Sequence, residues 1–153
     1  MKFRISRENL LGPLQLTSGV VERRQTSPVL ANLLLNLEKG RLVITGTDQE
    51  VELTVVIKEF VFGASGEVTV PARKLLEICK SLPEGAEMSA NLEGNRVAVD
   101  SGRFNSFLAT LPVIDFPNIQ TGAYDFSLEL SVQDLRGLLQ RTSFAMAQQD
   151  VRY

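Results

Sequence analysis

The hydrophobic residues of this chain follow two different periods along its first 58 residues. Residues 1–5 alternate apolar and polar side chains, as a half-buried strand does. Ser6 is placed to cap a helix over residues 7–18, in which Pro13 should cause a kink or an early end. Alternation then returns and predicts three strands, at 30–38, 41–48 and 50–58. The predicted order is one βαβββ unit.

The same order recurs in the following residues. A strand at 66–70 precedes Pro71, which suits the start of a helix over 71–82. Three more strands are expected, at 86–93, 96–102 and 104–111. Residues 1–120 therefore predict an α+β domain of two βαβββ units, in which two helices pack on antiparallel sheets.

The pattern begins a third time after residue 120. Residues 112–123 are rich in turn formers and predict a linker. A strand over 124–130 and a helix from Ser131 are expected next, and Ser131 and Asp134 are spaced like a capping box.

A nine-residue segment occurs twice, 125 residues apart. LLGPLQLTS (10–18) and LRGLLQRTS (135–143) are identical at six of nine positions, whereas average composition gives about one chance match in fifteen per position. We interpret the match as an internal repeat of domain size. The second copy has about thirty residues, too few for an autonomous domain. We therefore expect 1–120 to be one complete domain and 121–153 to be a linker and the truncated start of a second.

The composition excludes several kinds of chemistry. The chain has no histidine, so Ser-His-Asp catalysis, Cys-His catalysis and histidine metal sites cannot arise within it. Cys79 is the only cysteine, which fits a reducing cytoplasm. No apolar run approaches the length of a membrane span, and the first residues lack the apolar stretch of a signal peptide.

Five segments together resemble one known family. They are MKFRISRENLLGPLQ, GTDQEVE, TVPARKLLEICKSLPEG, ATLPVIDFPNI and FAMAQQDVRY. Their resemblance is to the bacterial sliding clamps, the beta subunits of DNA polymerase III, and it covers essentially the whole chain. It implies a processivity factor: two subunits of three similar domains close head to tail into a ring around duplex DNA and tether the polymerase. A fragment of this length should not close such a ring.

The distribution of charge agrees with that reading. The expected helices and their following turns (6–25, 71–82 and 131–150) hold eight basic and five acidic residues. The rest of the chain holds eight basic and thirteen acidic residues. A ring that slides needs phosphate contacts without base readout. A basic helical layer facing the DNA would supply them.

Four residues are expected to contact DNA. The resemblance implies contacts at Arg24 and Gln149, and the offset of 125 independently places these two at equivalent positions beyond the repeated helix. Arg73 and Lys80 share one face of the 71–82 helix and are expected to line the ring. A guanidinium or ammonium group can pair with phosphate, and a glutamine can donate a neutral hydrogen bond.

A second face of the same helix is expected to meet a partner subunit. Lys74, Ile78 and Leu82 are spaced i, i+4, i+8, which also fits a buried core stripe. In the family this face and the strand near 103–108 form the subunit contact, which implies roles for Arg103 and for Phe104 or Phe107. Which phenylalanine faces the partner stays open.

The last residues resemble the rim of the family's peptide pocket. Arg152 and Tyr153 would contribute to it, and the pocket captures short motifs of polymerases and clamp-loader subunits. The rest of the pocket would come from residues absent here, so this chain should bind such peptides weakly.

Two alternatives stay open. Asp48 and Glu50, with Glu52, could bind a divalent cation in an enzyme, although on one strand face a solvated role is the expectation. The chain could also be a duplicated α+β scaffold that does not bind nucleic acid. We find no catalytic constellation and expect no cofactor, so we predict that the protein is not an enzyme.

Overall fold

The structure, a computed structural model, describes residues 1–21, 27–58, 61–117 and 126–146. The chain divides into two compact units, Met1–Ile119 and Gln120–Tyr153. Each unit is described by itself below.

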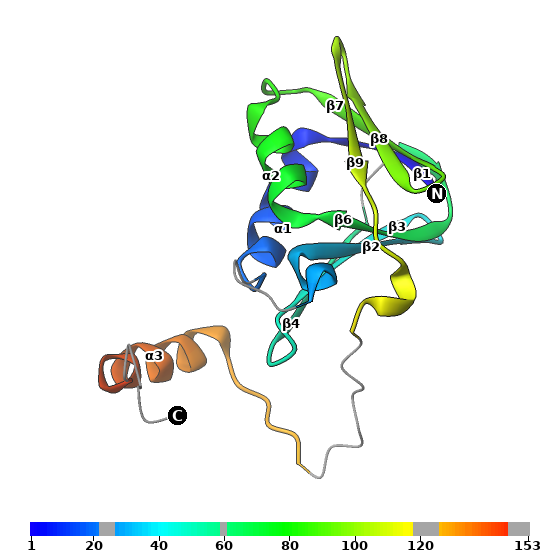
Figure 1. The fold of residues 1–153 in the computed structure, drawn as a ribbon. Coiled ribbons are helices and arrows are strands. Elements are labelled where there is room, and N and C mark those ends of the chain that lie inside the picture. The colour runs from blue at the N-terminus through cyan, green and yellow to red at the C-terminus, as the bar shows by residue number, and fades with distance from the viewer. Residues whose placement is uncertain (22–26, 59–60, 118–125, 147–153) are drawn as a thin grey trace. The chain divides into compact units, whose positions relative to one another are not determined.

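In its described residues, the first unit has two antiparallel sheets and two α-helices that lie side by side (Figure 1). One sheet has the strand order β5-β1-β7-β8-β9 and the other β4-β3-β2-β6. The elements are β1 (Lys2–Ser6), α1 (Arg7–Ser18), β2 (Asn32–Glu38), β3 (Arg41–Thr47), β4 (Glu52–Ile57), β5 (Val61–Ala64), β6 (Gly66–Pro71), α2 (Ala72–Ser81), β7 (Glu87–Glu93), β8 (Arg96–Ser101) and β9 (Phe104–Ala109). The predicted α+β fold with two βαβββ units is confirmed. The short strand β5, which pairs with β1, was not predicted.

Helix α1 begins where the sequence predicted. The Ser6 hydroxyl accepts a hydrogen bond from the Asn9 N–H at 3.3 Å, which caps the first turn. The helix continues through Pro13 to Ser18, so its predicted bounds are confirmed and Pro13 does not shorten it. Leu10 and Leu14 are buried on either side of the proline, and this burial stabilises the helix across the missing N–H.

One continuous hydrophobic core joins both sheets through the two helices. The alternating leucines Leu33, Leu35 and Leu37 point into it from β2, as their spacing predicted. Gly46 of β3 allows α1 to approach closely, because a Cβ atom there would lie 2.5 Å from the Thr17 carbonyl oxygen. Any side chain at this position would push the helix away from the sheet.

The acidic segment between β3 and β4 forms a turn rather than a strand. The Asp48 side chain accepts hydrogen bonds from the N–H groups of Glu50 and Val51, at 2.9 and 2.7 Å. Gln49 has a φ of 79°, which no strand residue adopts. Strand β4 therefore starts only at Glu52, and the expectation that Asp48, Glu50 and Glu52 share one strand face is wrong.

The segment that follows β9 is fastened to the outer face of the second sheet. The Thr69 hydroxyl donates to the Leu111 carbonyl at 2.8 Å and accepts from the Leu111 N–H at 2.9 Å. It also accepts from the Asn32 side-chain amide at 3.1 Å. Phe116 then packs with Val29 and Leu30 in a small separate cluster.

The second unit contains the helix α3 (Val132–Thr142). The N-cap half of the predicted capping box is confirmed, because the Ser131 hydroxyl accepts from the Asp134 N–H at 3.1 Å. The Asp134 carboxylate accepts from the Ser131 hydroxyl at 2.6 Å. The strand expected over 124–130 is absent from residues 126–130, since a strand requires a neighbouring strand to pair with. Among the described residues, no helix has the length and apolar composition of a membrane span.

We predict that Thr69→Val lowers the free energy of unfolding by about 1–3 kcal/mol, because the buried Asn32 amide and the Leu111 N–H lose their acceptor. Urea denaturation measures the change. Thr54→Val on the exposed edge strand β4 is the matched control, since water can replace its single bond to Thr45. Equal losses for the two variants would contradict the role given to Thr69.

Candidate functional site

Helix α2 presents two of the predicted cations on its solvent side. Arg73 and Lys80 are exposed and border a hollow of about 410 Å³ between α2, the end of α1 and residue Ala31. The Arg73 Nε atom lies 2.8 Å from the Glu77 carboxylate, so part of its charge is balanced within the helix. Lys80 makes no ion pair with another described residue. On this side of the helix, Lys80 is unpaired among the described residues and Arg73 is partly neutralised.

Arg24 and Gln149 lie outside the described residues, but the helices that precede them can be compared. The Thr17 hydroxyl donates to the Pro13 carbonyl at 2.9 Å. The equivalent Thr142 hydroxyl donates to the Leu138 carbonyl at 3.0 Å. The repeat therefore extends from sequence to local hydrogen bonding.

A second surface lies between α2 and the edge strand β9. Lys74, Ile78, Phe104 and Phe107 line one hollow of about 560 Å³. The structure therefore brings together four of the six residues expected at a subunit contact. Phe107 is 48% exposed, whereas Phe104 packs partly against the core. Of the two phenylalanines, Phe107 offers more surface to a partner.

Two residues of the expected contact lie elsewhere. Leu82 is 6% exposed and belongs to the core, so the i, i+4, i+8 stripe does not continue to it on the exposed face. The reason is that α2 ends at Ser81 and Leu82 is extended, with φ −71° and ψ 146°. Arg103 lies in the β8–β9 turn, beside a neighbouring hollow that Leu82 and Phe104 also line.

The guanidinium of Arg96 was not predicted to belong to this surface. It lies 4.0 Å from the centroid of the Phe107 ring, a distance at which a cation is attracted to an aromatic face. Arg96 pairs with Ala109 across the β8–β9 ladder, and Ala98 pairs with Phe107. The contact is therefore diagonal across two strands. Only the strand register reveals it.

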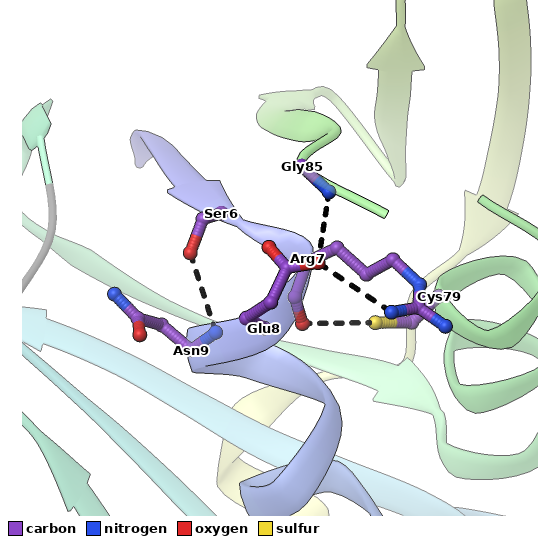
Figure 2. Close-up of polar contacts among 6 residues, drawn as sticks. All are labelled: Ser6, Arg7, Glu8, Asn9, Cys79 and Gly85. Atoms are coloured by element: carbon purple, nitrogen blue, oxygen red, sulfur yellow. Dashed lines mark hydrogen bonds and ion pairs between the residues drawn. The ribbon is translucent and has the colours of Figure 1, made fainter. Parts of the chain in front are cut away.

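The start of α1 is bonded to α2 and to the loop after it (Figure 2). The Cys79 thiol donates to the Arg7 carbonyl with a sulfur–oxygen distance of 3.8 Å, and the Arg7 N–H donates to the Ala86 carbonyl at 2.8 Å. The Glu8 carboxylate accepts from the Gly85 N–H at 3.0 Å and lies 3.5 Å from the Arg7 guanidinium. These bonds hold the start of α1 against α2, the helix that carries both surfaces described above.

Two ionisable groups in this cluster titrate away from their ordinary values. The pKa of Glu8 is lowered, chiefly by the hydrogen bond from Gly85 and then by its own N–H and by Arg7. Burial raises the pKa of the Cys79 thiol, so this cysteine stays protonated at neutral pH.

The described residues offer no support for a metal centre. They contain no group of three or more histidine, cysteine, aspartate or glutamate side chains that could share an ion. The Asp48 carboxylate is bonded to backbone amides, and the hydrogen bond from Val51 lowers its pKa. The Asp48 and Glu50 pair thus forms part of a turn. Arg152 and Tyr153 lie outside the described residues.

Comparison with known proteins identifies the chain's relatives. A family model described as the N-terminal domain of the DNA polymerase III beta subunit matches residues 1–120. The chain is 51% identical over its whole length to the beta sliding clamp of Pseudomonas putida and 46% identical to that of Escherichia coli K12. It spans 42% of the length of each of these relatives.

Solved structures give the same result. A sliding clamp from Pseudomonas aeruginosa, bound to griselimycin, has a TM-score of 0.95 and 51% identity, and the match covers 100% of this chain and 42% of that one. The polymerase III beta subunit of Caulobacter crescentus has a TM-score of 0.92 and 34% identity, and the match covers 100% of this chain and 41% of that one.

We predict that Glu8→Gln reduces the pH dependence of stability. The pKa of Glu8 is lower in the folded state than in the unfolded state. The stability that its ionised form contributes is therefore present above the unfolded-state pKa of about 4.3 and is lost as the pH falls through the folded-state pKa. The variant should therefore be less stable than the parent at neutral pH and lose less stability on acidification. Thermal unfolding from pH 7 to pH 3 measures this, with Glu84→Gln in the adjacent loop as the control. Parallel pH curves for parent and Glu8→Gln would refute the assignment.

Proposed function

Because the chain belongs to the family of the DNA polymerase III beta subunit, we propose that its protein is a sliding clamp. Such a protein encircles duplex DNA as a ring and tethers the replicative polymerase. The observation that carries the proposal is the likeness of the entire chain to clamps of known structure.

The proposed activity requires binding and no bond-making chemistry. A clamp must hold the duplex without choosing a sequence, which phosphate contacts achieve and base-edge contacts would prevent. Arg73 and Lys80 on α2, together with Arg24 and Gln149 beyond the repeated helices, would provide contacts of this kind. The protein would then act without a cofactor, in the bacterial cytoplasm where replication takes place.

The α2–β9 surface would form the contact between subunits. Strand β9 is the edge of its sheet, so its outer N–H and C=O groups are available to a strand of another subunit. Ile78, Phe104 and Phe107 supply apolar area beside that edge. Lys74, Arg96 and Arg103 lie around it, Arg96 is paired with Glu93 at 3.7 Å, and Glu77 lines the same hollow. The partner surface should therefore be apolar at its centre and carry charges of both signs at its rim.

Polymerase and clamp-loader subunits are proposed to bind a peptide pocket of the whole protein. Arg152 and Tyr153 would form one rim of that pocket. Their guanidinium and aromatic ring are side chains that commonly dominate the energy of such contacts.

We predict that Arg24→Ala or Lys80→Ala in the full-length protein weakens binding to duplex DNA and reduces its salt dependence. Each lost phosphate contact should lower the slope of log K against log salt by about 0.9. Binding measured at several salt concentrations with two unrelated duplex sequences tests this. Lys39→Ala in the β2–β3 turn is the control. An unchanged slope for either variant would show that the replaced residue, Arg24 or Lys80, does not contact the DNA phosphates.

We predict that Phe107→Ala weakens the subunit contact of the full-length protein by about 30-fold, the effect of a 2 kcal/mol hot spot. Sedimentation equilibrium measures the dimer dissociation constant. Val56→Ala, also a half-exposed strand residue, is the control because it lies in the other sheet. A Phe107→Ala protein that dimerises like the parent would place the contact elsewhere.

A further inference from the structure

The residues after β9 cover part of the outer face of the β4-β3-β2-β6 sheet, and we call residues 110–117 the strap (yellow in Figure 1). The two neighbours of Thr69 on β6 belong to the core, so the Thr69 side chain points to the outer face. It is nevertheless 0% exposed, and Asn32 beside it on β2 is 4% exposed. Thr54 on the outer face of β4 is exposed. The strap therefore covers the β2–β6 side of this face.

The start of the strap is held by one buried hydroxyl group. The Thr69 hydroxyl donates a hydrogen bond to the Leu111 carbonyl and accepts one from the Leu111 N–H. Its second acceptor position is taken by the Asn32 side-chain amide. A hydroxyl has one donor and two acceptor positions, and here all three are used. Both backbone groups of Leu111 are thus bonded to the same side chain of the sheet.

The end of the strap is held by apolar packing. Residues Val113–Asp115 form a 3₁₀ turn, which the Phe116 N–H closes with a bond of 3.0 Å to the first carbonyl of the turn. The Phe116 side chain is 8% exposed and packs with Val29 and Leu30, and Leu111 packs partly against the same cluster. A polar anchor at one end and an apolar anchor at the other therefore fasten the strap to the first unit.

This fastening changes the point at which the chain leaves the first unit. Strand β9 ends at Ala109, and the compact unit nevertheless extends through the whole strap. The strap has eight residues, which would span up to about 27 Å if they were released and extended. Fastening therefore takes up to this length out of the connection that leads to the second unit.

We propose that the strap shortens the tether between the two units: Thr69 and Phe116 hold residues 110–117 on the first unit, so that the connection begins at Pro117 instead of at Ala109. A shorter tether raises the effective concentration of one unit near the other without any added contact between them. Because it concerns only the connection between units, this role does not depend on the proposed binding of DNA.

The test measures distances between two nitroxide labels in the 153-residue chain by double electron–electron resonance. All samples carry Cys79→Ala, so that only introduced cysteines react. Glu84→Cys, an exposed position in the loop after α2, is combined in turn with three other exposed positions. Ile114→Cys on the strap gives the strap pair, Arg136→Cys on α3 gives the reach pair, and Lys58→Cys just after β4 gives the control pair.

The three label pairs should respond differently. In the parent, the strap pair should give a narrow distance distribution. Thr69→Val, and independently Phe116→Ala, should widen this distribution at least twofold and should extend the distribution of the reach pair to longer distances, by up to about 27 Å. The control pair should not change. Thr69→Ser, which keeps the hydroxyl, should behave like the parent, and so should Thr54→Val on the exposed part of the same sheet face.

Three results would overturn the proposal. A strap pair that stays narrow in both Thr69→Val and Phe116→Ala would show that these side chains do not hold the strap. A widened strap pair with an unchanged reach pair would show that the strap does not limit the distance between the units. Equal widening of the control pair would show that the variants disturb the whole first unit and not the strap.

Discussion

The first unit depends on the burial of one face of α1. Leu10, Leu14 and Thr17 are at most 1% exposed, and they lie against α2, β3 and β4. The single core that the two sheets share includes Leu10 and Leu14 of α1 and Leu75 and Cys79 of α2. Gly46 permits the approach of α1 to β3, and Cys79 bonds α2 to the first carbonyl of α1. If α1 were displaced, both surfaces of α2 would move with it.

Comparison of α1 with α3 shows which features of a helix depend on its local sequence and which depend on the surrounding structure. Residues 5–18 and 130–143, which contain the two helices, are identical at seven of fourteen positions. Both helices have a serine N-cap and a threonine whose hydroxyl is bonded to the carbonyl four residues earlier. The residues equivalent to the buried face of α1 are Leu135, Leu139 and Thr142, and in α3 all three are exposed. Helix formation and capping are therefore encoded locally, whereas burial depends on the surroundings.

This distinction explains which parts of the fold the sequence predicted. The helix bounds and caps were predicted to within about one residue, because they depend on serines, prolines and leucine spacing near at hand. Strand β5 and the Asp48 turn were missed, since the first exists by pairing with β1 and the second by bonds from backbone amides to one carboxylate. The strand expected before α3 had no partner strand to define it.

The same reasoning applies to the candidate site. Lys74, Ile78 and Phe107 come together as the resemblance implied, because β9 lies beside α2. Leu82 differs because the helix ends one residue before it, so the helical spacing that grouped it with Ile78 no longer applies. Arg96 could not be predicted, since its contact with Phe107 requires the β8–β9 register.

Helix α2 also couples the two surfaces that it carries. Glu77 borders both the hollow with Arg73 and Lys80 and the hollow with Lys74 and Phe107. Its carboxylate pairs with Arg73 one turn earlier, so it removes positive charge from the first surface while it lies beside the cation of the second. A change at Glu77 must therefore alter the electrostatics of both. If the two surfaces bind DNA and a second subunit as proposed, a substitution at Glu77 would change both affinities.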